Sequence, residues 1–287
     1  MTWTRNSGTS LGRAAATRLS TIGWNAFWWW QAVPRCAAAW IRDARGRRRY
    51  RALSNEQLLA TRRSDTAFIF GSGYSLNAIR AEEWRAIGRC DTMSFREFPR
   101  QSFVRADYHE TGEVDFLDEY ARRIRENPLY RDAVFVVQEG WRAFNGNNLI
   151  GRGLLTEGAR VFRYSRTARG RAAAPSRAFA DGLVHGFGSV FPVTNFAYLM
   201  GFRRIVLVGI DLNDKRYFWL APDELRTYEK PGLAVDSVFT GADDIVSLMG
   251  VWRELLEKEG VALSVFNPGS RLTKVLPVFR FEPPELS

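Results

Sequence analysis

The fold is decided by residues 67–76, AFIFGSGYSL, where a short apolar run meets a turn that contains two glycines. A continuous apolar run of this length is typical of a strand covered on both faces. Gly71 ends the strand, Gly73 allows the backbone to approach a ligand closely, and Ser75 stands where the next helix begins. Because helix N-termini attract anions, we predict that these residues, with Ser72, face the phosphate of a nucleotide.

The same turn excludes two common nucleotide sites. Leu76 occupies the place of the third glycine in the dinucleotide-binding fingerprint, and no Gly-Lys-Ser/Thr sequence follows for a P-loop. A simple NAD site and a P-loop are therefore not expected. A tight strand-to-helix turn without a ligand remains the alternative.

Strand and helix patterns alternate along the rest of the chain. Strands are predicted at residues 67–71, 91–95, 103–106, 133–137, 159–164, 205–210 and 261–266. Helices are predicted at residues 77–88, 114–126, 190–200 and 242–259, after a short helix that opens with the capping box Ser54-x-x-Gln57. This order predicts an α/β fold with a doubly wound, mainly parallel, Rossmann-like sheet in one domain, residues 53–287. Ligands bind such sheets at the carboxyl ends of the strands.

A second turn, GIDLND (residues 209–214), follows the apolar run IVLVGI. Asp211 stands at the exposed end of this predicted strand. A carboxylate at that place can bind ribose hydroxyls, hold a metal ion or cap nearby backbone N–H groups. The sequence leaves all three roles open.

A third turn, HGFGS (residues 185–189), precedes a predicted helix whose N-terminus forms a second anion site. His185 is a candidate general acid or base in this turn. Its alternative is a polar residue whose hydrogen bonds are satisfied within the protein.

A fourth turn, RADYHETGE (residues 105–113), holds Asp107, His109 and Glu110 in what we predict to be a loop after a strand. Carboxylate and imidazole groups together can bind sugar hydroxyls. The same residues fit equally well at a capped helix start.

The N-terminal residues 1–52 form a separate basic arm. Ten of the 41 Lys and Arg residues but one of the 31 Asp and Glu residues fall within residues 1–51, so the net charge of +10 belongs to the arm and the body is nearly neutral. Residues 21–41 hold five Trp and are interrupted by Gln31, Pro34 and Arg35. Trp and Arg on one short helix favour the headgroup region of an anionic membrane, so we predict a helical membrane-interfacial arm.

Other placements of the arm stay open: a helix packed on the body or on a partner, a true membrane span, or disorder. A signal peptide is rejected, because the arm has no clean aliphatic run and no small-residue cleavage site. Two cysteines and no disulfide framework favour a reducing compartment. We therefore expect a cytoplasmic protein attached peripherally to the inner face of the cytoplasmic membrane.

Several partners are not expected. His109 and His185 are the only histidines, which excludes a multi-histidine metal site, and we predict neither a metal nor a cofactor. The body has no basic excess and no recognised nucleic-acid motif, so no nucleic acid is expected either.

Four segments together resemble the bacterial sialyltransferase family that uses CMP-activated sugars, and the related Maf-flagellin glycosyltransferase and MptE-like group. The segments are IFGSGYSLNAI (69–79), DTMSFREF (91–98), SVFPVTNFAYLMGFRRIVLVGIDLND (189–214) and VALSVFNPGSRLTKVLP (261–277). The resemblance implies a GT-A-variant fold whose nucleotide sugar lies across the strand order's switch point. It implies nucleotide or donor contacts at Gly71, Ser72, Gly73, Ser75, Arg96, Asp107, His109, Glu110, Gly188, Ser189, Asp211 and Asn213.

The chain departs from that family in two places. Family members bind the departing phosphate with tyrosines in and just after the GID segment, whereas Asn213 follows here and Tyr217 is the nearby candidate to replace them. Their catalytic histidine precedes the long C-terminal helix, but residues 236–244, DSVFTGADD, contain none. Asp236 or Asp243 is then a candidate base, as is His185.

The resemblance therefore implies a glycosyltransferase that transfers a CMP-activated acidic sugar, sialic acid-like or Kdo-like, to a glycan or glycolipid in bacterial surface-glycan synthesis. Arg203, Lys215 and Arg216 suit an acidic donor. One alternative is an MptE-like pterin pyrophosphokinase that uses ATP, with Asp211 and Asp214 as magnesium ligands. The other is a non-catalytic protein that binds a nucleotide sugar or a glycan.

Overall fold

The structure is a computed structural model that describes residues 41, 44, 49–112, 114, 116–139, 147–214, 216–220 and 241–282. These residues contain one sheet of eight strands, every neighbouring pair of which is parallel. In chain order the strands are β1 (Arg51–Ala52), β2 (Thr66–Phe70), β3 (Asp91–Phe95), β4 (Tyr108–Thr111), β5 (Val134–Glu139), β6 (Arg160–Ser165), β7 (Arg204–Val208) and β8 (Ala262–Val265). The predicted α/β fold with a parallel, doubly wound sheet is confirmed.

The strand order reverses at β2. Strands run β1-β6-β5-β4-β3-β2-β7-β8 across the sheet, so the chain builds outward from β2 in one direction and then returns to add β7 and β8 on its other side. The next α-helix after β2, α3 (Ala81–Gly88), and the next after β7, α7 (Ala242–Glu257), pack on opposite faces of the sheet. Ligands of doubly wound folds bind in the crevice formed there.

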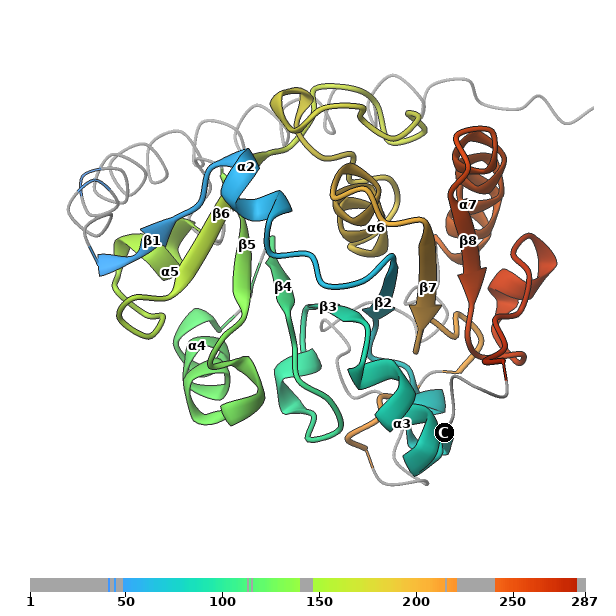
Figure 1. The fold of residues 1–287 in the computed structure, drawn as a ribbon, viewed down its shortest axis with the longest axis horizontal. Helices are drawn as coiled ribbons and strands as arrows, with labels where there is room; N and C mark the ends of the chain where they lie inside the picture. Colours follow the sequence, from blue (N-terminus) through green and yellow to red (C-terminus); the bar gives the residue numbers. More distant parts are fainter. Residues whose placement is uncertain are drawn as a thin grey trace, which may run out of the picture.

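Helices cover both faces of the sheet (Figure 1). One face packs against α2 (Asn55–Leu59), α6 (Val190–Leu199) and α7 (Ala242–Glu257). The other packs against α3 (Ala81–Gly88), α4 (Leu117–Glu126) and α5 (Asn147–Gly151). The central strands are buried on both sides because helices cover both faces of the sheet.

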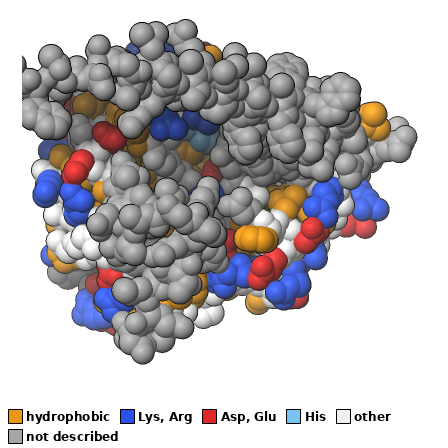
Figure 2. Space-filling view, turned by 180° about the vertical axis from the view of Figure 1, so that it is seen from behind, with side chains coloured by type: hydrophobic (Ala, Val, Ile, Leu, Met, Phe, Trp, Pro, Cys, Tyr) orange, Lys and Arg blue, Asp and Glu red, His pale blue; other side chains and the backbone are white. Residues whose placement is uncertain are grey.

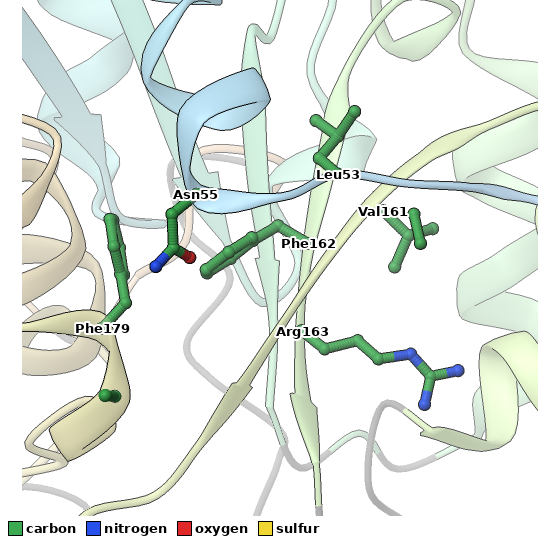
Figure 3. A pocket seen from close by; sticks show the side chains of 8 residues that line it. Leu53, Asn55, Val161, Phe162, Arg163 and Phe179 are labelled. Atoms are coloured by element: carbon green, nitrogen blue, oxygen red, sulfur yellow. The ribbon is translucent and has the colours of Figure 1, made fainter.

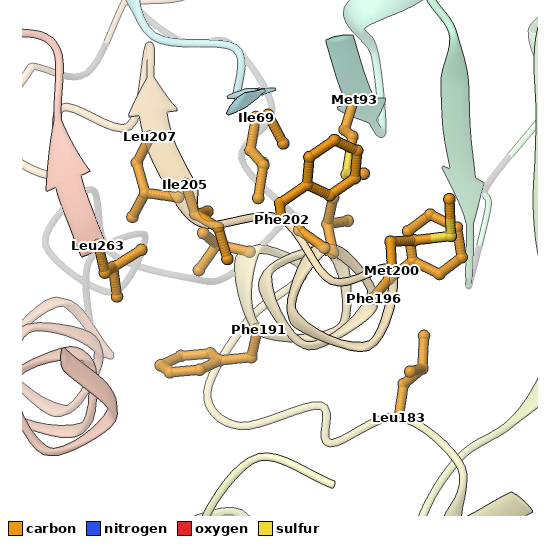
Figure 4. Packing of buried hydrophobic residues seen from close by; sticks show 14 of the residues in the cluster. Ile69, Met93, Leu183, Phe191, Phe196, Met200, Phe202, Ile205, Leu207 and Leu263 are labelled. Atoms are coloured by element: carbon orange, nitrogen blue, oxygen red, sulfur yellow. The ribbon is translucent and has the colours of Figure 1, made fainter. Parts of the chain in front are cut away.

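Helix α6 is the centre of the first layer. All residues from Val190 to Ala197 are buried, as expected for a helix that is apolar all round. Figure 4 shows Phe196, Met200 and Phe202 over the strand residues Ile69 and Met93, with Phe191 on the far side of the helix. Burial of each such side chain contributes roughly 1.5–3 kcal/mol.

The second layer explains why one predicted strand, residues 103–106, is wrong. The ring of Trp84 in α3 stacks between Phe70 of β2 (5.7 Å) and Phe103 (5.0 Å). The side-chain oxygen of Gln101 accepts hydrogen bonds from the N–H groups of Phe103 (2.5 Å) and Val104 (3.0 Å), so the chain turns here instead of extending. The strand begins later, at Tyr108.

The main differences in helix boundaries lie in two places. The expected helix 114–126 begins only at Leu117. The expected helix 77–88 is split into a 3-10 helix, Tyr74–Ala78, and α3. The Ser54–Gln57 capping box of α2 is present, with Ser54 Oγ accepting from Gln57 N at 3.2 Å. Arg51 and Ala52, placed in the arm by the sequence, form β1.

Nearly all of the arm lies outside the described residues, so its predicted helix and membrane contact stay predictions. Among the described residues, no helix combines the length and apolar character needed to cross a membrane.

Candidate functional site

The two glycines after β2 allow the turns of β2 and β7 to touch. Gly73 N donates to Gly209 O at 2.7 Å, and Gly71 N donates to Val208 O at 2.8 Å. A Cβ at Gly73 would lie 2.4 Å from Asp211 Oδ2, and one at Gly71 would lie 2.6 Å from Gly209 O. We predicted that the glycines would let the backbone approach a ligand closely. In the structure they let the turn after β2 approach the turn after β7.

Asp211 braces this junction. Its carboxylate accepts hydrogen bonds from Ser75 N (3.1 Å), Ser75 Oγ (2.6 Å) and Asn267 Nδ2 (2.8 Å), and the residue is only 4% exposed. Of the three roles left open by the sequence, the structure shows capping. The protein's own carboxylate occupies the start of the 3-10 helix where we predicted a phosphate.

Residues 216–220 pack along the same turn. Tyr217 forms a β-bridge with Gly73, and Phe218 N donates to Ser72 O at 3.2 Å. The ring of Tyr217 stacks on Trp219 with centroids 4.4 Å apart. The guanidinium of Arg216 lies 3.8 Å from the centre of the Tyr74 ring.

These contacts bring the predicted phosphate-binding tyrosine beside the glycine turn. Arg216 also forms a 2.7 Å ion pair with Asp214, which holds its guanidinium there. Asn213, by contrast, is exposed and donates to Gly269 O at 2.9 Å, away from Tyr217 in the sequence-neighbouring loop. Lys215 lies outside the described residues.

Asp107 is placed at the opposite edge of the sheet, which corrects its assignment to the ligand site. It precedes β4, so it lies at the amino ends of the strands. Its carboxylate accepts from Thr92 N at 3.0 Å and pairs with Arg63 at 2.6 Å. It closes the amino edge and does not face the glycine turn.

His109 is also corrected, because it lies inside β4 and not in a loop. Its Nδ1 is 2.8 Å from Ser94 Oγ and its Nε2 is hydrogen-bonded to the hydroxyl of Tyr120. The ring is fully buried on the α4 side of the sheet, and burial lowers its pKa to about 3. His109 is a neutral core histidine with both nitrogens satisfied, not a sugar contact.

Glu110 points to the other face of β4 and meets two residues from distant segments. The hydroxyl of Tyr164 in β6 donates to Glu110 Oε1 at 2.5 Å and lies 3.3 Å from His185 Nε2. Burial raises the pKa of Glu110 to about 7, against the lowering effects of the Tyr164 hydrogen bond and of Arg96. Burial, helped by Arg166, lowers the pKa of His185 to about 4.

The structure therefore joins two residues that the sequence placed in separate turns. Glu110 lies near the carboxyl end of β4, and His185 lies in the turn before α6. Arg96, which follows β3 with a left-handed φ of 56°, is exposed and acts electrostatically on Glu110. Strongly shifted carboxyl and imidazole groups at one position are a mark of functional sites.

Tyr164 and Gln138 complete this cluster and were missed by the sequence reasoning. Gln138 pairs with Tyr164 in the register of β5 and β6, so their side chains share a face. Its Oε1 is buried, and no residue that the structure describes hydrogen-bonds to it. A polar residue within an apolar strand pattern, as in VFVVQE, is the signal that could have identified it.

The turn before α6 brings His185, Gly188 and Ser189 together. Gly188 N donates to His185 O at 3.3 Å, and Ser189 is the N-cap residue, whose side chain makes no capping hydrogen bond. Both Gly188 and Ser189 are partly exposed. A histidine is visible at the surface beside basic side chains in Figure 2, and His185 is partly exposed whereas His109 is fully buried.

Of the other candidate bases, Asp243 is described and does not contact this cluster. Asp236 lies outside the described residues. Asp243 is in the first turn of α7 and forms an ion pair with Arg271. Among the residues that the structure describes, no group of three His, Cys, Asp or Glu side chains is placed to hold a metal ion.

A separate cavity of about 310 Å³ lies at the edge of the sheet, where β1 ends beside β6. Figure 3 shows Phe162 turned toward Asn55 and Phe179, whereas Arg163 extends to the other side of the strand. The rings of Phe162 and Phe179 are 5.0 Å apart and form the apolar side of the cavity. None of the predicted site residues lines it.

No protein-family model matches the sequence, and no curated protein matches it. Similar solved structures include a Maf glycosyltransferase from Magnetospirillum magneticum AMB-1 (TM-score 0.47, 18% identity, 78% of this chain and 35% of that chain). They also include two Campylobacter jejuni proteins: the sialyltransferase CstII in complex with a substrate analogue, CMP-3FNeuAc (0.44, 12%, 74% and 85%), and the monofunctional α-2,3-sialyltransferase Cst-I (0.45, 13%, 76% and 83%). The chain thus spans about a third of the length of the Maf protein. These structural neighbours come from the same groups that the sequence resembles.

Proposed function

We propose that this protein is a glycosyltransferase that transfers an acidic sugar from a CMP-activated donor to a hydroxyl group of a glycan or glycolipid. The observation that carries the proposal is the cluster of Glu110, Tyr164 and His185 at the carboxyl ends of β4 and β6 and the start of α6. A base and a buried carboxyl at this edge suit proton removal from an acceptor hydroxyl. The resemblance of the four sequence segments supports the choice of donor.

The nucleotide is proposed to lie on the outer side of the glycine turn. Ser75 and Asp211 satisfy each other, which leaves Ser72, Arg216 and Tyr217 as the groups that a ligand can reach from residues 216–220 and the turn. A guanidinium and a phenol hydroxyl can both stabilise the charge on a departing phosphate.

The acidic sugar is proposed to lie toward α6. The N-terminal turn of this helix, with Gly188 and Ser189, favours a carboxylate, and Arg96 and Arg166 add positive charge around Glu110 and His185. In this arrangement the sugar carbon that reacts lies between the phosphate side at Tyr217 and the base side at His185.

The binding step is tested by thermal unfolding of the full-length protein with CMP, UDP, GDP and ATP–Mg²⁺. A ligand at 100 times its Kd stabilises by about 2.7 kcal/mol, which raises the Tm by roughly 5–10 °C for a protein of this size. We expect that rise with CMP and its loss in Tyr217→Ala. Tyr198→Ala, at the partly buried C-terminal end of α6, is the matched control. No rise with CMP contradicts the proposal.

Transfer of diphosphate from ATP is less favoured by the contacts of its two candidate magnesium ligands. Asp211 is committed to Ser75 and Asn267, and Asp214 is paired with Arg216. A Tm rise with ATP–Mg²⁺ but not with CMP is the result that this alternative requires.

The membrane arm remains part of the proposal, because a lipid-linked acceptor is presented at a bilayer face. We propose that residues 1–51 bind anionic membranes from the cytoplasmic side. Sedimentation with vesicles that contain phosphatidylglycerol tests this: binding should be lost on deletion of residues 1–48 and weakened by salt. Binding that survives the deletion would place the membrane contact on the body.

A further inference from the structure

A hydrogen-bonded chain leads from the surface into the sheet through His185, Tyr164 and Glu110. The Tyr164 hydroxyl donates its proton to Glu110 Oε1 at 2.5 Å. Because the Tyr164 hydroxyl has given its proton to Glu110, its oxygen can only accept a hydrogen bond from His185 Nε2, 3.3 Å away. His185 Nε2 therefore carries the imidazole proton. Nδ1 of this partly exposed ring is left as an acceptor, and no described residue hydrogen-bonds to it.

Gln138 supplies an independent observation at the inner end of the chain. Its buried Oε1 has no hydrogen-bond partner among the described residues, and an unpaired buried acceptor costs about 1–3 kcal/mol. A Cβ on Gly112 would lie 2.9 Å from Glu110 Oε1 and 3.1 Å from Gln138 Oε1, so both oxygens border the same small space. The Gln138 carbonyl oxygen can accept a hydrogen bond from Glu110 only when the Glu110 carboxyl is protonated, because an ionised carboxylate has no proton to donate.

We propose that Glu110, Tyr164 and His185 form a proton relay for glycosyl transfer, in which His185 is the catalytic residue and Gln138 is the positioning residue that receives the protonated Glu110. This inference rests on the proposed transferase function. It assigns the base role to His185, in place of the missing histidine before α7.

Each step of the relay balances. The acceptor oxygen forms its bond to the sugar carbon as the bond from that carbon to the phosphate oxygen breaks, and the nucleotide leaves with the electron pair. The acceptor proton moves to His185 Nδ1, the Nε2 proton moves to the Tyr164 oxygen, and the Tyr164 proton moves to Glu110. The imidazole ends neutral as the other tautomer, and the carboxylate ends as a carboxylic acid.

The charges around the chain favour this end state over an imidazolium. Arg166 faces His185 and, with burial, lowers its pKa to about 4, so the ring does not retain a proton at neutral pH. Glu110 interacts with the Tyr164 hydroxyl and the Arg96 charge, and its own charge acts on Tyr120 across the sheet. Burial raises the pKa of Glu110 to about 7. The proton therefore rests more favourably on Glu110 than on His185.

Histidine NMR tests the coupling without any assay of activity. The chain has two histidines, so protein labelled with ¹³C,¹⁵N-histidine gives two sets of ring signals, which His185→Gln assigns. We expect His185 to be neutral with its proton on Nε2, and its signals to report the ionisation of Glu110 as an inflection near pH 7. We expect the same inflection in the signals of His109, the neighbour of Glu110 in β4. Tyr164→Phe should remove the inflection from His185 and leave it in His109.

Kinetics then test the relay itself, with CMP-sialic acid as the donor probe and water or an added glycan as the acceptor. Tyr164→Phe and Glu110→Gln should lower kcat about 10- to 100-fold with little change in KM for the donor, and His185→Gln about 100-fold or more. Tyr198→Phe is the matched control for Tyr164→Phe and should retain the wild-type kcat.

Failure of the relay and failure of the proposed function give different results. A wild-type His185 signal without the inflection, or turnover by Tyr164→Phe with an unchanged kcat and pH profile, overturns the relay. An intact NMR coupling in a protein that neither binds CMP nor turns over the donor supports the coupled chain and overturns the CMP-sugar function.

Discussion

Substitution of Asp211 tests whether its carboxylate stabilises the junction between the β2 and β7 turns or binds a ligand. This side chain is 4% exposed and accepts three hydrogen bonds that tie the β2 turn to the β7 turn and to Asn267. A hydrogen bond to a charged group contributes about 1.5–3 kcal/mol, but three bonds to one carboxylate do not add fully. We therefore expect Asp211→Ala to destabilise the protein by about 4 kcal/mol, a large share of a typical 5–15 kcal/mol.

Two further variants give smaller expected losses of stability, against which the loss in Asp211→Ala is compared. Asp211→Asn keeps the shape and one acceptor oxygen, but its amide must face Ser75 N–H or the Asn267 amide, both of which are donors. We expect a loss of about 2 kcal/mol from this variant. Asn213→Ala removes one exposed hydrogen bond to Gly269 O and should cost under about 1 kcal/mol.

Urea unfolding followed by far-ultraviolet circular dichroism measures these differences. With an m-value of about 3 kcal/mol/M, the Asp211→Ala midpoint should fall by about 1.3 M. The affinity for CMP is measured in parallel under native conditions. A midpoint shift below about 0.3 M together with a tenfold or greater loss of CMP affinity would refute the stabilising role of Asp211 and indicate that it binds the ligand.

Three other predictions concern the glycine turn, His109 and Glu110. Gly73→Ala places a Cβ 2.4 Å from Asp211 Oδ2 and should cost more than about 2 kcal/mol, whereas Gly188→Ala meets only Ile245 at 3.6 Å and should be nearly neutral; the reverse order in thermal unfolding would contradict the packing. Burial lowers the folded-state pKa of His109 to about 3, so stability is full above pH 6.5 and falls as the pH decreases from there toward 3, because only the unfolded chain binds the proton. His109→Gln should reduce that fall between pH 7 and pH 4.5, and an undiminished fall in urea titrations would rule His109 out as its cause. Burial raises the pKa of Glu110 to about 7, so stability present below pH 4.5 is lost as the pH rises through 7. Glu110→Gln should therefore gain roughly 1–3 kcal/mol at pH 8, and equal stability of variant and wild type there would show that the carboxyl is not desolvated.

The sequence predicted the layers of the fold well because most strands are uninterrupted apolar runs. Residues 133–137 and 205–210 were assigned from such runs and correspond to β5 and β7. β4 was not predicted because its sequence, Tyr-His-Glu-Thr, is polar. Polar side chains are tolerated in a buried strand only when other segments supply their hydrogen bonds. Those partners, Ser94, Tyr120 and Tyr164, come from places that no local pattern links to β4.

The site was predictable in part for the same reason. That the turns after β2 and β7 lie together follows from the alternation of strands and helices. Which groups they offer to a ligand does not, since Ser75 and Asp211 bind each other only once the strand order is established. His185 was identified by residue type, but its link to Glu110 depends on Tyr164, a residue with no signal of its own in the sequence.

The pairing of β2 with β7 has a consequence for how the protein is made. Thr66 and Arg204 are partners across this pair and lie 138 residues apart, so the chain between them must be synthesised before the switch point exists. At 5–20 residues per second, ribosomes need roughly 7–28 s for that length. During this interval the β2 edge is an unpaired apolar strand, which is a template for wrong pairing. We expect the amides of Gly73 and Ser75 to gain protection from hydrogen exchange among the last during refolding, and pulse labelling that protects them early would contradict this order. The junction at which the nucleotide is proposed to bind is then also among the last parts of the sheet to form on the ribosome.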